Sequence, residues 1–98
     1  MSLEKRIKRA YENLKAPKGM FAVGVWDPSN PEKSIPYIVE TETTKRDAVY
    51  SSEKYAKWYA KLRDKKWKKE YQEANEEKKA YMCEEDYFVV NEKGVKIY

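Results

Sequence analysis

Apolar residues near the start of the chain recur with the period of a helix. From Leu3 to Leu14 they are spaced three or four positions apart, so they fall on one helical face. Ser2 can cap the first turn with its hydroxyl, and Pro17 and Gly19 stop a helix from continuing. The pattern therefore predicts a short amphipathic helix before residue 17.

Four short segments have the composition of β-strands. Residues 20–26 (MFAVGVW) form an apolar run with β-branched and aromatic members, typical of a buried strand. A proline-rich loop follows, and residues 37–44 (YIVETETT) favour a second strand by their β-branching. Residues 87–90 and 95–98 flank a four-residue loop that ends in Gly94, which predicts a hairpin.

The segment from about residue 51 to 80 contains neither Gly nor Pro and predicts a long helix. On a helical wheel its apolar residues form two arcs instead of one. The first arc contains Tyr55, Trp58, Tyr59 and Leu62, and the second contains Ala56, Ala60, Trp67, Tyr71, Ala74 and Tyr81. Either the helix breaks near residues 63–65, or one long helix is buried on two sides, one of them by another chain. We favour the second interpretation.

The order of these elements is α-β-β-α-β-β. It predicts one α+β domain spanning residues 1–98, with a small antiparallel sheet of about four strands packed against one short N-terminal and one long central helix.

The composition indicates the environment of the protein. Lys and Glu together number 30, whereas Gln and His together number one. This bias is typical of hyperthermophile proteins, so we expect a hyperthermophile or its virus as the source. No apolar run reaches the roughly 20 residues needed to span a membrane, and no signal peptide opens the chain, so we expect a cytoplasmic protein without membrane contact.

Positive charge is concentrated in the predicted central helix. Residues 45–69 contain ten basic side chains and three acidic ones, whereas residues 70–92 contain eight acidic side chains and two lysines. Such a separation favours a directional contact, either with a partner or head-to-tail between copies of the chain. Five lysines fall along one line of the helix, away from both apolar arcs, and we call them the lysine row: Lys54, Lys57, Lys61, Lys65 and Lys68.

The lysine row contains like charges three or four residues apart, and each such pair costs a few tenths of a kcal/mol. A nucleic-acid backbone would compensate that cost, because lysines neutralise phosphates and release counterions. Arg6 and Arg9 would extend the patch if the first helix packs alongside the central one. Trp58 and Trp67 would stack on unpaired bases if exposed, although tryptophans are more often core residues. The plainer interpretation is a solvated helix face.

The sequence gives little support for an enzyme. It has no histidine, one cysteine and no glycine-rich phosphate loop, and we expect no cofactor and no metal site. A metal-dependent nuclease is the one catalytic alternative, with Asp27, Glu40 and Glu42 gathered near Lys45. Strand alternation opposes it, because it would turn Lys45 away from the two glutamates.

Two functions remain from different classes. The first is a small non-enzymatic nucleic-acid-binding protein, acting as a homodimer, with phosphate contacts from the lysine row. The second is a protein-interaction module, such as a small inhibitor or assembly factor, that docks through Tyr55, Trp58, Tyr59 and its acidic C-terminal part. Aromatic side chains are enriched at the centres of such interfaces.

Overall fold

The computed structural model describes residues 3–29, 36–41 and 43–98 of the chain. Its elements are α1 (Leu3–Asn13), β1 (Phe21–Trp26), β2 (Tyr37–Ile38), β3 (Val49–Tyr50), α2 (Glu53–Glu73), α3 (Glu76–Tyr81) and β4 (Asp86–Val90). The strands form one antiparallel sheet, which confirms the predicted α+β class.

Strand β1 lies at the centre of the sheet, because every other strand pairs with it. Strand β4 pairs antiparallel with residues 22–26 of β1, along one edge of that strand. Strand β2 pairs with Gly24 and Val25, and β3 pairs with Phe21 and Ala22. Because β4 occupies one edge of β1 throughout, β2 and β3 pair one after the other with the opposite edge. Between β2 and β3, Glu40 and Asp47 form an isolated antiparallel β-bridge.

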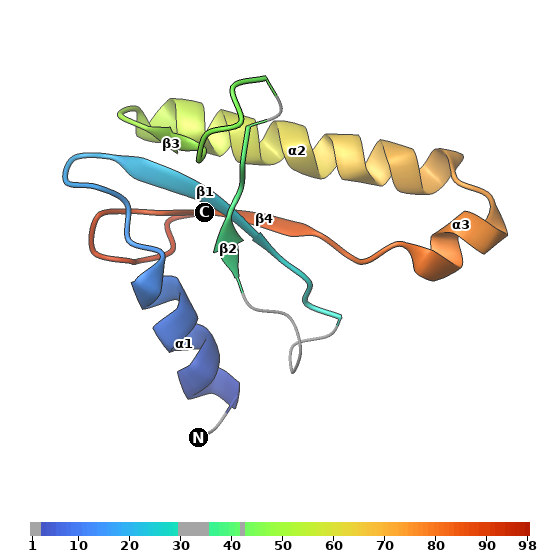
Figure 1. The fold of residues 1–98 in the computed structure, drawn as a ribbon, viewed down its shortest axis with the longest axis horizontal. Coiled ribbons are helices and arrows are strands. Elements are labelled where there is room, and N and C mark those ends of the chain that lie inside the picture. The colour runs from blue at the N-terminus through green and yellow to red at the C-terminus, as the bar shows by residue number, and fades with distance from the viewer. Residues whose placement is uncertain (1–2, 30–35, 42) are drawn as a thin grey trace.

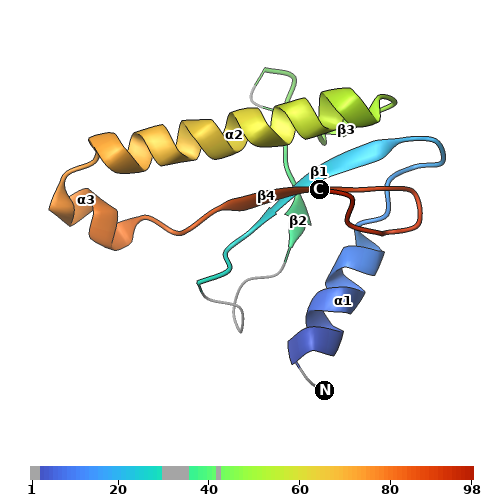
Figure 2. The same cartoon turned by 180° about the vertical axis from the view of Figure 1, so that it is seen from behind.

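The two longer helices cover opposite faces of the sheet (Figure 1, Figure 2). Alternation along β1 sends Val23 and Val25 into a core cluster with Ala56 and Ala60 of α2. The neighbouring Ala22 joins a second cluster with Ala16, Phe88 and Val90, against which Tyr11 and Leu14 pack from the α1 side. The sheet is therefore buried on both faces, and its two helices are separated by it.

This arrangement contradicts one expectation about the first helix. Arg6 and Arg9 were expected to extend the lysine row if their helix packed alongside the central one. Instead, α1 lies across the sheet from α2 (Figure 1), so the condition for that extension is not met.

Several element boundaries differ from the predicted ones. Helix α2 continues through residues 63–65 and ends at Glu73, and Asn75 caps a separate α3 by accepting a hydrogen bond from the Lys78 N–H at 2.8 Å. The regular part of the second predicted strand is only Tyr37–Ile38, and β3 was not predicted.

The predicted C-terminal hairpin turns at Gly94, which has a φ of +74°. Residues 95–98 run back beside β4, but only Val90 and Lys96 form a β-bridge there. Backbone hydrogen bonds from Ile97 N–H to Val89 O and from Asn91 N–H to Val95 O hold the returning segment in place.

None of the helices in the described part of the chain combines the length and apolar character that crossing a membrane requires.

Candidate nucleic-acid interface

Two alanines fix the orientation of α2 on the sheet. Ala56 and Ala60 are fully buried, one helical turn apart, in the core cluster that contains Val23, Val25 and Val89. Their small side chains let the helix approach the sheet closely. The start of the helix is set by Ser52, whose hydroxyl accepts a hydrogen bond from the Tyr55 N–H at 3.1 Å.

A polar cluster attaches the middle of α2 to β4. The Arg63 guanidinium donates hydrogen bonds to the Tyr59 hydroxyl at 3.1 Å and to the Tyr87 hydroxyl at 3.4 Å. The Tyr87 hydroxyl donates to the Glu85 carboxylate at 2.5 Å, and the Tyr87 N–H donates to Asp64 at 3.3 Å. These contacts turn Arg63 and Asp64 toward the sheet, and so turn the opposite side of the helix toward solvent.

This cluster makes the fold sensitive to alkaline pH. Burial raises the pKa of Tyr87, the adjacent Glu85 raises it further, and Arg63 opposes the rise. The unfolded chain therefore loses this proton near pH 10, before the folded chain does. Stability is fully present below that pH and falls as the pH rises toward the folded pKa.

We expect Tyr87→Phe to lose less of its free energy of unfolding between pH 9 and pH 11 than the wild type does. Urea denaturation at the two pH values measures the difference. An equal loss in both proteins would show that Tyr87 does not contribute.

Trp67 has a structural role. Its indole N–H donates to the Cys83 carbonyl at 3.0 Å, and its ring stacks on Tyr71 with centroids 5.2 Å apart. The ring is half-buried, so Trp67 holds the segment that precedes β4. Of the two tryptophans considered for base stacking, only Trp58 is exposed.

The lysine row lies on the solvent side of α2. Lys54, Lys61, Lys65 and Lys68 are exposed and Lys57 is half-buried. The row spans roughly 21 Å at about 1.5 Å per residue. Lys57 forms an ion pair with Glu53 of the same helix at 3.6 Å.

The remaining contacts of the row leave its charge uncompensated by other elements. The Lys61 ammonium lies 5.6 Å from the centroid of the Tyr98 ring, which is a neutral partner. Burial raises the pKa of Asp64, and Lys68 opposes that rise from one turn along α2. Within residues 3–29, 36–41 and 43–98, no carboxylate from another element forms an ion pair with the row. The row is thus an open line of positive charge.

Aromatic and aliphatic side chains border this line. Trp58 is 53% exposed and Tyr55 is 47% exposed, with ring centroids 5.3 Å apart. Helical spacing makes Lys54 and Lys61 the neighbours of Trp58 at four residues before and three after. Leu62, also exposed, follows one turn after Trp58. The predicted interface residues Tyr55 and Trp58 are therefore accessible, whereas Tyr59 is half-buried against the core.

The structure does not bring together a metal site from the described acids that were considered for a nuclease. The Asp27 carboxylate accepts hydrogen bonds from Ser29, and the backbone of Glu40 forms a β-bridge with that of Asp47. Glu42 lies outside the described residues. Among the residues that the structure describes, no group of three or more His, Cys, Asp or Glu side chains could hold a metal ion.

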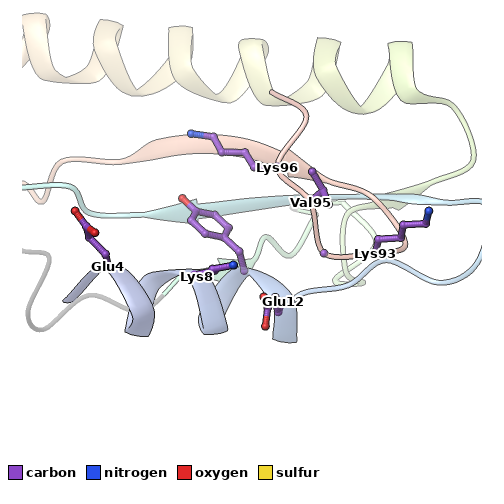
Figure 3. A pocket seen from close by; sticks show the side chains of 8 residues that line it. Glu4, Lys8, Glu12, Lys93, Val95 and Lys96 are labelled. Atoms are coloured by element: carbon purple, nitrogen blue, oxygen red, sulfur yellow. The ribbon is translucent and has the colours of Figure 1, made fainter. Parts of the chain in front are cut away.

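A hollow of about 490 Å³ opens on the far side of the sheet, between α1 and the C-terminal segment. Figure 3 shows the residues that line it, with Glu4, Lys8 and Glu12 on α1 and Lys93, Val95 and Lys96 on the C-terminal segment. Its charges are of both signs, so they do not select an anion. It also lies on the α1 side of the sheet, away from α2, and we do not assign the interface to it.

The contacts that orient α2 were not predicted from the sequence. Arg63 and Asp64 are charged residues within a basic segment, and nothing in their spacing distinguishes them from their solvated neighbours. Tyr50 was also missed, although it follows Ala48-Val49 in a short apolar run that could have signalled a strand.

Comparisons with known proteins supply no relative. No family model matches the chain, and no curated protein or solved structure matches it significantly. Its function must therefore be argued from the geometry of α2.

Proposed function

We propose that this protein binds nucleic acid through the lysine row of α2. The observation that supports the proposal is the row itself: five lysines on one helical line, with no ion pair to another element among the described residues. Like charges at this spacing destabilise a helix slightly, and an external polyanion would remove that cost. Phosphates spaced along a strand fit ammonium groups spaced along a helix, because each lysine can meet one phosphate and release its counterion.

The chemistry of binding requires no base contact from the row. Lysine is a strongly hydrated point charge with three donors on a flexible stem, suited to phosphate oxygens and indifferent to sequence. The affinity should therefore depend on charge and salt, with little preference among sequences.

The test is the salt dependence of binding. A labelled 12-nucleotide single strand and a labelled 20-base-pair duplex are titrated with protein between 50 and 200 mM salt. Five phosphate contacts predict slopes of log K against log salt of about −3.5 on the single strand and about −4.5 on the duplex. Absence of binding to both at 50 mM salt would contradict the proposal.

The exposed Tyr55, Trp58 and Leu62 also favour a second candidate, a protein-interaction module or a homodimer joined through this apolar area. Sedimentation at several concentrations tests self-association. For another protein partner, Tyr55→Ala would weaken a stoichiometric complex whose affinity changes little with salt.

A further inference from the structure

We propose that the aromatic side of α2 takes unpaired bases, so that the ligand of the lysine row is single-stranded nucleic acid. This inference rests on the proposed function and names its ligand class. It draws on observations beyond the row: an exposed tryptophan, a series of aromatic rings and a hollow, all on one side of the helix.

Trp58 is placed to stack on a base while its neighbours hold the backbone. It is more than half exposed, although full burial would be the favourable state for an indole ring. Lys54 and Lys61 lie one turn to either side of it. A strand whose phosphates contact these two lysines would bring an intervening base to the Trp58 ring. In a duplex the base is already stacked between its neighbouring bases, so it does not stack on the Trp58 ring.

The aromatic surface continues beyond Trp58 toward the sheet. Tyr55 lies next to it, Tyr50 of β3 lies 4.7 Å from Tyr55 between ring centroids, and Tyr59 lies 5.8 Å from Tyr50. The planes of neighbouring rings are tilted by 43° to 66°, so each exposed ring offers its own face, and such a face accepts any base because every base has a π-face.

A hollow of about 260 Å³ opens beside these rings. Tyr50, Tyr55 and Tyr59 form its aromatic walls, and Thr41, Thr43 and Arg63 also line it. This volume is below the roughly 300–1,000 Å³ of pockets for drug-sized ligands, which suits a single planar ring system. Aromatic walls and threonine hydroxyls match a base, and the Arg63 guanidinium beside them donates to the Tyr59 and Tyr87 hydroxyls.

The experiment compares ligands that share their phosphates and differ in their bases. The wild type is titrated with a 12-nucleotide thymidine strand, the matching uridine strand, an abasic 12-mer and a 12-base-pair duplex at 100 mM salt. We expect at least one base-bearing single strand to bind about tenfold more tightly than the abasic strand. The tighter of the thymidine and uridine strands identifies DNA or RNA as the preferred class.

A variant locates the effect. Trp58→Ala should reduce the ratio of base-bearing to abasic affinity from about ten toward one, and Trp58→Phe should keep most of the ratio because it keeps a ring. Tyr81→Ala, which removes a ring that is 81% exposed on α3, is the matched control and should leave the ratio unchanged.

The possible failures are distinguishable. Equal affinity for base-bearing and abasic strands, or an unchanged ratio in Trp58→Ala, would overturn this inference and leave phosphate binding by the lysine row intact. If the wild type binds none of the four ligands, both this inference and the proposed function are overturned.

Discussion

Reversing three charges in the middle of the lysine row should lower the affinity for nucleic acid about 100-fold. In the variant Lys57→Glu, Lys61→Glu, Lys65→Glu, each attraction to a phosphate becomes a repulsion. An exposed charge pair contributes up to about 1 kcal/mol, so three changes amount to about 3 kcal/mol or more. Since 1.4 kcal/mol is a factor of ten, the loss is about two orders of magnitude. Fluorescence polarisation with a labelled single strand at 100 mM salt measures it.

The control must change the net charge equally without touching α2. Lys15, Lys18 and Lys93 are exposed and lie outside that helix, and reversing all three lowers the net charge by the same six units. This control should lose much less affinity than the row variant. Circular dichroism should show both variants folded, because Glu and Lys are similarly good helix formers in α2 and the three control lysines are exposed outside the helices. Equal losses would indicate attraction by overall charge instead of a located site.

Removing the ring of Phe88 should lower the free energy of unfolding by about 3–5 kcal/mol. Phe88 is fully buried in the cluster on the α1 side of the sheet, and Tyr11 packs edge-on against its ring with centroids 4.8 Å apart. A domain of this size has a total stability of about 5–15 kcal/mol, so Phe88→Ala removes a large share of it. Urea denaturation followed by circular dichroism measures the change. Tyr81→Ala should change stability by less than about 0.5 kcal/mol, because its ring is exposed.

Gly24 explains how the Phe88 ring fits, and it supplies a second check. A Cβ at Gly24 would lie 2.4 Å from the Phe88 Cζ, closer than two carbon atoms can pack. Gly24→Ala alone should therefore cost about 1–3 kcal/mol by overpacking. In the Phe88→Ala background the ring is absent and the Tyr37 carbonyl oxygen, 3.0 Å from the added Cβ, is the nearest remaining neighbour, so the same change should cost less. Additive losses in the two backgrounds would contradict this packing.

The elements with a strong hydrophobic pattern could be predicted from the sequence. Helix α1, strands β1 and β4 and most of α2 followed from the period of apolar residues. The end of α2 at Glu73 could not, because Ala74 and Asn75 do not prevent a helix; the break depends on Asn75 capping α3. The two-residue strand β3 is too short for a periodic signal.

The sequence did not decide which of the two apolar arcs of the central helix contacts the core. The core contact comes from Ala56 and Ala60, whose small side chains carry a weak hydrophobic signal. The larger Tyr55, Trp58 and Leu62 are exposed, because close packing of the alanines on the sheet leaves them on other faces of α2. Helical spacing placed the lysine row on one line, but the absence of an ion pair from the row to another element among the described residues depends on tertiary structure.

Contact between the lysine row and phosphates is tested most directly by the salt dependence of a neutralised variant. In Lys57→Gln, Lys61→Gln, Lys65→Gln the contacts are removed without introducing repulsion. Each lost contact reduces the slope of log K against log salt on a single strand by about 0.7. We therefore expect a slope about 2 units shallower than that of the wild type. A slope that remains the same would show that these lysines do not contact the ligand, and would contradict the account.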